Sequence, residues 1–535
     1  MTDDTTTPPD RRRWLGLVVV SVAVALIIVD STIVNVAIPS VVTELDLDST
    51  AVQWVQESYT LVFAALLLVF GALADRFGRR RLLMIGVAVF AISSVGAALA
   101  PDGGLLIAAR FVQGAGGAMI LPTTLSIINA TFRGRERGIA FAVWGSTIGG
   151  MAAVGPILGG WLTTDFSWRW AFGINLPLGA LLLVGAALVV RPSRAPGRGG
   201  IDAIGGLLSV ILFTSLVYGL IEGRTVGWWT IATRPRIGDW TWPFDVSPIP
   251  VAFGVALLAL IAYIAWGLHR RRIGRDPIIA FELFRIASFR NGNIAALIVA
   301  LGEFGIILSL PLWLQNVLGY DALQTGLVLL ALAVGSFLAS GFAATGGARL
   351  GPLRVVRIGI AAEVVGLVIV GLVISPDTPW WAICAGLFVY GFGVGLATAQ
   401  LTGVVLADVP VERSGQASGT QSTSRQVGSA LGIAILGTIL FTSLGGILAA
   451  RLPDSIPAAQ RDAIVDAVVD SSGGAIPSLG ARSPSAESAA KEAFSDATKA
   501  AAFSAAGALA LGLASTLTLR SRPAPRDDES PLSRT

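Results

Sequence analysis

Cysteine, histidine and charge are scarce in this chain of 535 residues. Cys384 is the only cysteine, His269 is the only histidine, and charged residues make up 13% of the chain. One cysteine cannot form an intramolecular disulfide, and one histidine without cysteine partners does not supply a transition-metal site. A soluble protein usually carries about 25% charged residues, because its surface faces water. These shortages exclude a soluble enzyme or binding module, and we expect neither a metal nor a cofactor.

Long uncharged runs take the place of the missing charge. The hydrophobic fraction is 54% and the mean hydropathy is +0.74. Apolar runs of ~20 residues, the length that crosses ~30 Å of hydrocarbon as a helix, recur from Trp14 to Leu519. We therefore predict an all-α, multi-pass membrane protein with fourteen spans. Their predicted limits are 14–39, 52–73, 82–100, 104–126, 139–162, 169–190, 203–222, 248–268, 292–314, 324–345, 357–375, 379–405, 418–445 and 498–519.

The basic residues predict the orientation of these spans. The chain holds 38 lysines and arginines, has a net charge of +4 and a pI near 9.6. If both termini are cytoplasmic, most of the 38 fall on the cytoplasmic side, in runs such as 76–81 and 270–275. We count Arg425 with them, at a cytoplasmic helix end. Cytoplasmic loops of membrane proteins carry such an excess, which explains the pI without nucleic acid.

An internal repeat organises the spans. An offset near 275 residues spans eight helices, so two matching halves of six helices require spans seven and eight to be an insertion. Two parallel halves with a substrate site between them are typical of membrane transporters. We therefore predict a six-plus-two-plus-six arrangement. The matched pairs, at offsets of 273 to 277, are Arg76 with Arg349, Gly78 with Gly351, Gly86 with Gly359, Gly114 with Gly391 and Gly116 with Gly393.

This arrangement divides the chain into five regions. They are a cytoplasmic tail at 1–13, an N-terminal six-helix bundle at 14–190, two inserted helices with their linkers at 191–291, a C-terminal six-helix bundle at 292–519, and a cytoplasmic tail at 520–535. The C-terminal bundle includes a long external loop, 446–497, in which a stripe of Ile464, Val465, Val468 and Val469 predicts a short amphipathic helix.

Charged residues inside the spans are candidates for function. Asp30 and Glu57 lie within apolar spans, and so, with less support because neither has a motif of its own, do Glu303 and Glu363. An ionised carboxylate in a membrane helix costs at least ~2.5 kcal/mol, so it faces a cavity or partner, or it is protonated. Such groups bind and release protons. The alternatives are that Asp30 caps a helix break and that Glu57 is merely interfacial.

Arg110 begins the intramembrane part of the fourth span, within ARFVQGAGGA. A guanidinium at this depth needs carboxylates, carbonyls or water. Its positive charge favours the ionised form of a nearby carboxylate, so its approach and withdrawal would drive proton release and uptake. The alternative is a purely structural salt bridge or carbonyl clamp.

The fifth span is crowded with glycine around a proline, in WGSTIGGMAAVGPILGGWL. Small residues allow helices to approach closely, and Pro156 removes a backbone donor and favours a bend. Packing alone explains the glycines, whereas glycines on both sides of a proline favour a conformational role. The residues concerned are Gly155, Pro156, Gly159 and Gly160.

Taken together, these motifs resemble the major facilitator superfamily, and specifically its fourteen-span drug:proton antiporter family. The segment GALADRFGRRR is similar to the family signature between spans two and three, ARFVQGAGGA to that of span four, and GPILGGWL to the antiporter signature of span five. DSTIVNVAIP, QWVQESYTL, WRWAFGINLPLG and GQASGTQSTSRQVGSALG are also similar. The resemblance covers nearly the whole chain.

The resemblance implies roles for several residues. Carboxylates at the positions of Asp30 and Glu57 would take part in proton coupling or cation recognition, and an arginine at Arg110 in proton transfer. The first copy of the loop signature would latch the outward-facing state, whereas the second copy has Ala348 where the first has Asp75, so the latch would be one-sided. The latch residues are Gly71, Asp75, Arg76, Gly78 and Arg79.

We therefore predict a plasma-membrane exporter of amphipathic drugs or other toxic small molecules, driven by proton exchange. Its partners would be a small-molecule substrate, protons and the lipid bilayer, and we expect a monomer. The alternative within transport is export of a cell-envelope lipid or of one self-produced antibiotic. A receptor or scaffold would need a larger cytoplasmic domain, and an enzyme would need a nucleophile or metal constellation that the sequence does not offer.

Overall fold

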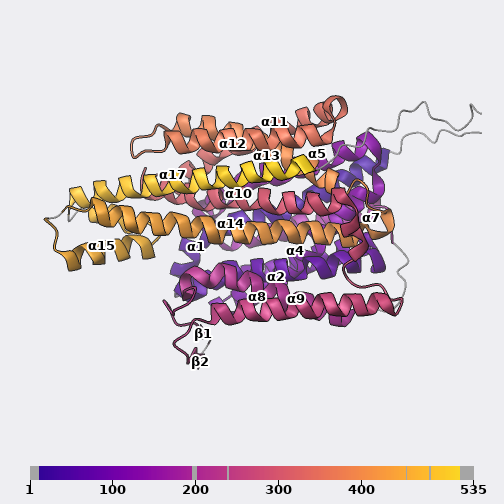
Figure 1. The fold of residues 1–535 in the computed structure, drawn as a ribbon, viewed down its shortest axis with the longest axis horizontal. Helices are drawn as coiled ribbons and strands as arrows, with labels where there is room; N and C mark the ends of the chain where they lie inside the picture. The colour runs from indigo at the N-terminus through magenta and orange to yellow at the C-terminus, as the bar shows by residue number, and fades with distance from the viewer. Residues whose placement is uncertain are drawn as a thin grey trace, which may run out of the picture.

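The computed structural model describes residues 11–47, 49–194, 202–237, 240–453, 455–480 and 483–518. Over these ranges the chain is almost entirely helical, and its long helices lie side by side along one axis (Figure 1). The predicted tails lie outside these ranges, except that helix α1 already begins at Arg11. The all-α prediction is confirmed for the described chain, apart from one short ribbon.

We describe the helices in three consecutive groups, named after the predicted regions. The N-terminal half consists of α1 (Arg11–Leu45), α2 (Ser49–Phe77), α3 (Arg79–Ala98), α4 (Gly103–Thr131), α5 (Gly134–Asp165), α6 (Arg169–Gly173) and α7 (Asn175–Val189). The inserted pair, α8 (Ala203–Val226) and α9 (Pro248–Arg272), is joined by the ribbon β1 (Arg236–Ile237) and β2 (Trp240–Thr241) and is followed by η1 (Phe281–Arg285). The C-terminal half consists of α10 (Ala287–Asn316), α11 (Ala322–Leu350), α12 (Pro352–Val373), α13 (Trp380–Val405), η2 (Val411–Arg413), α14 (Ser414–Arg451), α15 (Ala458–Asp470), α16 (Ile476–Leu479), α17 (Pro484–Ser515) and η3 (Thr516–Thr518).

The two halves meet along a few helix pairs. Helix α5 packs against α11 and α13, and α2 packs against α14. Helices α8 and α9 pack against each other, and α8 covers α2 on one flank of the bundle (lower edge in Figure 1). Trp144, Trp313 and Tyr390 are buried in a hydrophobic core that continues through both halves. The inserted pair therefore extends the bundle without entering its centre.

Eleven helices of the described chain are long and apolar enough to cross a membrane. Helix α11 adds a shorter apolar stretch, Leu323–Ala339. The predicted total of fourteen spans and their six-plus-two-plus-six order stay predictions. One end of the bundle holds the junction of α2 with α3 and the start of α14. We call it the basic end, because Arg76, Arg79, Arg80 and Arg413 lie there.

Backbone geometry supports the internal repeat. Gly78 and Gly351, which are matched in the sequence, precede α3 and α12 with φ angles of 102° and 83°. Such left-handed angles are readily adopted only by glycine. The close contact of α3 with α4 recurs between α12 and α13. A Cβ on Gly86 would lie 3.0 Å from the carbonyl oxygen of Gly116, and a Cβ on Gly359 would lie 2.9 Å from that of Gly393.

Helices continue into both ends of the predicted external loop, 446–497. Helix α14 continues to Arg451 and α17 begins at Pro484, so the connection covers only 452–483. The first part of α17 was assigned to the loop because it is too polar to resemble a membrane span, but its many alanines strongly favour a helix. Within the connection, α15 is the predicted short helix, and its Val468 is fully buried.

Candidate functional site: a buried ion pair and a cross-half latch

Asp30 of α1 lies at the centre of a buried polar cluster in the N-terminal half. Its side chain is 0% exposed, and that of Arg110 from α4 is 2% exposed. Arg110 Nη1 donates to Asp30 Oδ2 at 2.7 Å and to Gln113 Oε1 at 2.6 Å. Gln113 Nε2 donates in turn to Asp30 Oδ1 at 2.7 Å. The structure therefore brings together two predicted site residues, which lie 80 positions apart.

Asn175 and Ser94 complete this cluster and were not predicted. Asn175 Nδ2 donates to Asp30 Oδ1 at 2.6 Å, and Ser94 Oγ accepts from Asn175 and Gln113. Asn175 begins α7 immediately after the break that separates α6 from α7. The sequence did contain a signal for Asn175 and Gln113. Both are amides within otherwise apolar segments, and both lie inside the quoted family motifs.

The guanidinium of Arg110 is held on its other sides as well. Its Nε donates to the carbonyl oxygen of Val55 at 3.1 Å, and its Cζ lies 4.4 Å from the ring centroid of Tyr59 and 5.9 Å from that of Phe172. Removing one partner of such a buried pair leaves an uncompensated charge and costs about 3–5 kcal/mol. The cluster therefore resists loss of the Asp30 charge unless Arg110 moves or its surroundings become wet.

The glycines of GPILGGWL pack against the helix that carries Asp30. A Cβ on Gly155 would collide with the Thr32 hydroxyl, and one on Gly159 would lie 2.8 Å from Ile33 Cγ1 and 3.0 Å from its carbonyl oxygen. Pro156 stands between these glycines in α5, and its side chain is outside the described structure. Helix α5 is therefore packed closely against the turn of α1 that follows Asp30.

Two neighbouring glycines of this motif should respond oppositely to the same substitution. Gly159→Ala adds a methyl group against α1 and should destabilise the protein by about 1–3 kcal/mol. Gly160→Ala should be neutral or slightly stabilising, because nothing lies within 4 Å of its Cβ position and alanine favours helix. Thermal unfolding of the two variants in detergent measures the difference, and equal midpoints would contradict the close packing.

Asp75 joins the two halves at the basic end. Its carboxylate accepts hydrogen bonds from the backbone N–H of Gly415, at 2.9 and 2.8 Å to its two oxygens, and of Gln416 at 3.1 Å. These amides belong to the first turn of α14, where the helix dipole favours a negative charge. Arg79 Nη2 donates to Asp75 Oδ1 at 2.8 Å and to the carbonyl oxygen of Val411 at 2.6 Å.

Gly71 allows α2 and α14 to approach closely beside these bonds. A Cβ on Gly71 would lie 2.6 Å from the carbonyl oxygen of Gly415 and 2.7 Å from the Cα of Gly419. The latch residues differ in what they do: Gly71, Asp75 and Arg79 contact the other half, whereas Gly78 shapes the turn between α2 and α3, and Arg76 is exposed. We use the name latch for the contacts of Gly71, Asp75 and Arg79 with residues 411–419.

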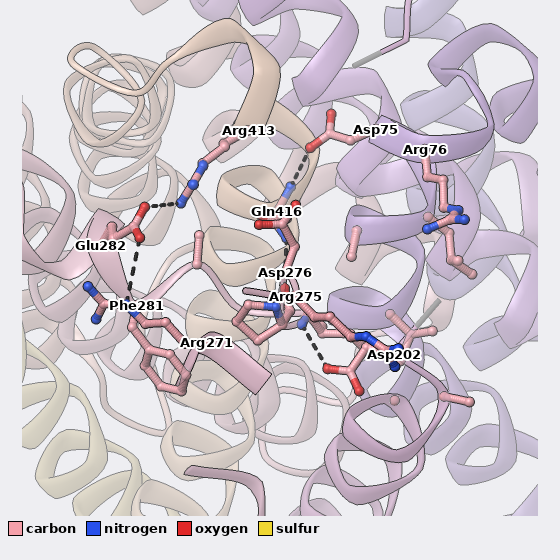
Figure 2. Close-up of a pocket in the computed structure, with 18 of the residues that line it drawn as sticks. Asp75, Arg76, Asp202, Arg271, Arg275, Asp276, Phe281, Glu282, Arg413 and Gln416 are labelled. Carbon is pink, nitrogen blue, oxygen red and sulfur yellow. Dashed lines mark hydrogen bonds and ion pairs between the residues drawn. The ribbon is translucent and has the colours of Figure 1, made fainter. Parts of the chain in front are cut away.

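A cavity of about 680 Å³ opens beside the latch, between α2, α8, the segment after α9 and the start of α14 (Figure 2). The segment after α9 is bound to the same part of the C-terminal half as Asp75. Gln416 Nε2 donates to the carbonyl oxygen of Pro277 at 3.0 Å, and Arg413 Nη1 lies 2.6 Å from Glu282 Oε2. Separation of α2 from α14 therefore requires this linker to move or to release its contacts.

Glu303 of α10 forms a second buried ion pair, in the C-terminal half. It is 4% exposed, its Oε2 accepts from Arg425 Nη2 at 3.0 Å, and its Oε1 accepts from Thr398 Oγ1 at 3.1 Å. The assignment of Arg425 to a cytoplasmic helix end is therefore wrong. It lies about three turns into α14, where its charge needs a buried partner.

Glu57 is not part of the Asp30 cluster. It lies on α2 and interacts electrostatically with Tyr218 on α8. Trp54 of α2 and Val217 of α8 also pack together there. The structure thus places this predicted site residue against the inserted pair. Among the described residues, no group of three or more His, Cys, Asp or Glu side chains is arranged to hold a metal ion.

Comparison with known proteins gives matches over most of the chain. The sequence model of the Major Facilitator Superfamily matches residues 20–433. "Puromycin resistance protein pur8" of Streptomyces alboniger is 35% identical over 80% of this chain and 82% of its own. "Probable actinorhodin transporter" of Streptomyces coelicolor is 33% identical over 81% of this chain and 73% of its own. "Multidrug efflux pump LfrA" of Mycolicibacterium smegmatis is 32% identical over 81% and 82%.

Solved structures share the fold at low sequence identity. The human organic anion transporter MFSD10 (TETRAN) superposes with a TM-score of 0.61 over 95% of this chain and all of its own, at 13% identity. The proton:xylose symporter XylE superposes with a TM-score of 0.55 over 87% of this chain and 95% of its own, also at 13% identity. These likenesses concern the arrangement of helices.

Proposed function

Because the chain belongs to the Major Facilitator Superfamily and is a multi-pass membrane transporter, we propose that it exports amphipathic drugs or other toxic small molecules in exchange for protons. The observation that carries this proposal is the buried cluster of Asp30 and Arg110, in which the carboxylate accepts hydrogen bonds from two amides and from one positively charged partner, Arg110. Its relatives are named for drug resistance and export, and its localisation is the plasma membrane.

We place fourteen spans in the membrane, in a six-plus-two-plus-six order. To the eleven long apolar helices we add α5, α10 and α11, which have 32, 30 and 29 residues. At 1.5 Å per residue, each is longer than the ~30 Å of hydrocarbon. The paired glycine geometry of the two halves and the peripheral position of α8 and α9 support the insertion. The transporter would act as a monomer.

In the proposed cycle, the two halves rock about the substrate and open alternately to each side. The latch would close the cytoplasmic side, which we identify with the basic end, and hold the outward-facing state. In that state a proton would enter from outside and neutralise Asp30, while Arg110 leaves Asp30 and keeps its bonds to Gln113 and the Val55 carbonyl. Release of the latch would then expose Asp30 to the cytoplasm, where the proton leaves and Arg110 returns.

The proton gradient would supply enough free energy for this exchange. Inward movement of one proton through 100 mV releases about 2.3 kcal/mol, and a difference of one pH unit adds about 1.4 kcal/mol. A neutral substrate would thus be concentrated ~50-fold by that voltage alone. We assign the carboxylates of Asp30 and Glu303 to proton coupling, and Glu57 to the face that meets the inserted pair.

Transport in proteoliposomes with an imposed pH gradient tests the proposal. A panel of cationic dyes, antibiotics and lipids separates multidrug export from the second candidate, export of one self-produced antibiotic, which the relative named as an actinorhodin transporter supports. Uphill movement of several unrelated drugs is expected. Movement of a single compound would favour the second candidate, and movement that ignores the pH gradient would overturn proton coupling.

Asp75→Asn should slow turnover without weakening substrate binding. The substitution removes the negative charge that faces the first turn of α14 and directs an amide donor toward backbone donors. Charge-assisted hydrogen bonds contribute about 1.5–3 kcal/mol each, so the equilibrium constant for closing the latch should fall by roughly tenfold or more. Transport rate and equilibrium binding are to be measured on the same purified protein.

An exposed ion pair gives the control for this variant. Glu44→Gln breaks the contact of Glu44 with Arg169, in which the carboxylate side chain is 52% exposed, and should leave turnover nearly unchanged. If Asp75→Asn turns over as fast as wild type at equal protein level, the latch does not limit the cycle.

A further inference from the structure

Glu363 of α12 is a fully buried acid without a hydrogen-bond partner. It is 0% exposed, and neither of its carboxyl oxygens has a partner among the described residues. An ionised carboxylate left without donors in an apolar interior is far more costly than the neutral acid. The surroundings of Glu363 in this conformation therefore fit the neutral, protonated acid and not the ionised carboxylate.

The charges around Glu363 lead to the same conclusion. Glu363 interacts electrostatically with Glu303 of α10 and Arg425 of α14, and these two already form an ion pair with each other. From α13, Tyr390 donates to the backbone carbonyl of Glu303 at 3.2 Å and Thr398 donates to its carboxylate. The cluster thus holds two carboxyl groups and one guanidinium, and one proton balances its charge.

Arg425 also has an N–H donor that is not used. Its Nη2 binds Glu303, whereas its buried Nη1 has no partner in the described structure. When the Glu363 O–H bond breaks and the proton passes to water, this N–H is an unused donor from which the new carboxylate would accept once the two side chains approach each other. The cluster therefore has a stable arrangement for both protonation states, which a purely structural buried acid does not need.

The internal repeat shows that the acid is not required for packing. Glu303 stands 273 positions after Asp30, the same offset that matches Gly78 with Gly351, and at that offset Glu363 corresponds to Phe90. Phe90 is fully buried in the N-terminal half. An aromatic ring thus fills this place in one half and a carboxyl group fills it in the other. Gly393 provides the room, because a Cβ there would lie 2.7 Å from Glu363 Cγ.

We propose that Glu363 is a second proton carrier, located in the C-terminal half and exchanging its proton against the Glu303–Arg425 pair. This inference rests on the proton-coupled export proposed above and extends it. Asp30 and Glu363 together move two protons inward in each cycle. Export of a monovalent cation then carries one net positive charge inward, so it responds to the membrane potential.

Infrared spectroscopy of the purified protein tests the protonation state without any substrate. Wild type near neutral pH should show the C=O stretch of a buried, protonated carboxylic acid, and Glu363→Gln should lack it. Glu303→Gln should lack it as well, because Glu363 then becomes the ionised partner of Arg425. Glu44→Gln is the matched control with an exposed acid and should keep the band.

These variants also protect the test against misfolding. Should Glu363→Gln fail to fold, Glu303→Gln still decides the question, since a purely structural Glu363 would keep its proton there. An unchanged carboxylic acid band in either variant overturns the inference.

Transport of a monovalent aromatic cation dye separates this inference from the general proposal. In proteoliposomes, the compartment into which protons flow is made electrically negative. Wild type should then concentrate the dye about 50-fold further for each 100 mV of potential, whereas Glu363→Gln should respond to the pH gradient alone. If wild type follows neither gradient, the proposed function fails. If wild type follows both and Glu363→Gln keeps its full response to potential, only the second carrier is refuted.

Discussion

Replacing Asp30 with asparagine is expected to remove the uphill export that the Asp30 proton drives and to leave substrate binding intact. Asparagine nearly preserves the shape of the side chain, but it cannot exchange a proton. The ~50-fold accumulation that this proton supports at 100 mV should therefore be lost. Uphill transport and equilibrium binding, measured on the same preparation, check the two halves of this prediction.

The same variant should lose stability, for a reason that can be removed. The introduced amide would face Arg110 Nη1, leaving a buried guanidinium with only Gln113 and the Val55 carbonyl. Loss of one partner costs about 3–5 kcal/mol. In the double variant Asp30→Asn with Arg110→Gln, most of this stability should return, because the unpaired charge is gone, but coupling should not return. Uphill export by either variant that equals that of wild type would exclude Asp30 as a proton carrier.

Gly71→Val should prevent closure of the latch and reduce transport at least tenfold. Even a Cβ at this position lies 2.6 Å from the carbonyl oxygen of Gly415, and valine adds two further carbons against backbone atoms of α14. Overpacking of this kind costs about 1–3 kcal/mol or more. The clash exists only while α2 and α14 are together, so the cost falls on the closed state and shifts the population toward the opening of the basic end.

Distance measurements between labels on α2 and α14 at the basic end show this shift directly. Gly254→Val in α9 is the matched control, because nothing lies within 4 Å of its Cβ position. It should leave both transport and the distance distribution unchanged. A closed distance and normal transport in Gly71→Val would show that close approach of these helices is not needed for the cycle.

The sequence allowed much of this architecture to be predicted, because long apolar runs and repeated glycine motifs depend on local composition. The Asp30–Arg110 pairing was predictable for a related reason, since two opposite charges in one apolar bundle each need a partner. For the glycines at 155 and 159 close packing was the alternative to a conformational role, and the structure identifies the surface they contact as α1.

Other parts of the site depend on three-dimensional neighbours that a linear pattern does not reveal. Arg425 was misplaced because its flanking sequence is polar and resembles a helix end, although Glu303 lies beside it from another helix. Asn175 was missed because an amide carries no charge to attract notice. The extent of α17 was missed because hydropathy fails in its alanine-rich, charged first turns. In each case the deciding partner is far away in the chain.

Substrate-induced proton release from the purified, detergent-solubilised protein tests the central claim most directly. Addition of a transported drug to wild type, followed with a pH indicator at several pH values, should release protons because substrate and proton compete through the Asp30 cluster. The Asp30→Asn variant should release at least one proton fewer per protein. Equal release from the variant and from wild type, at equal substrate occupancy, would contradict the account and direct attention to Glu303 and Glu363.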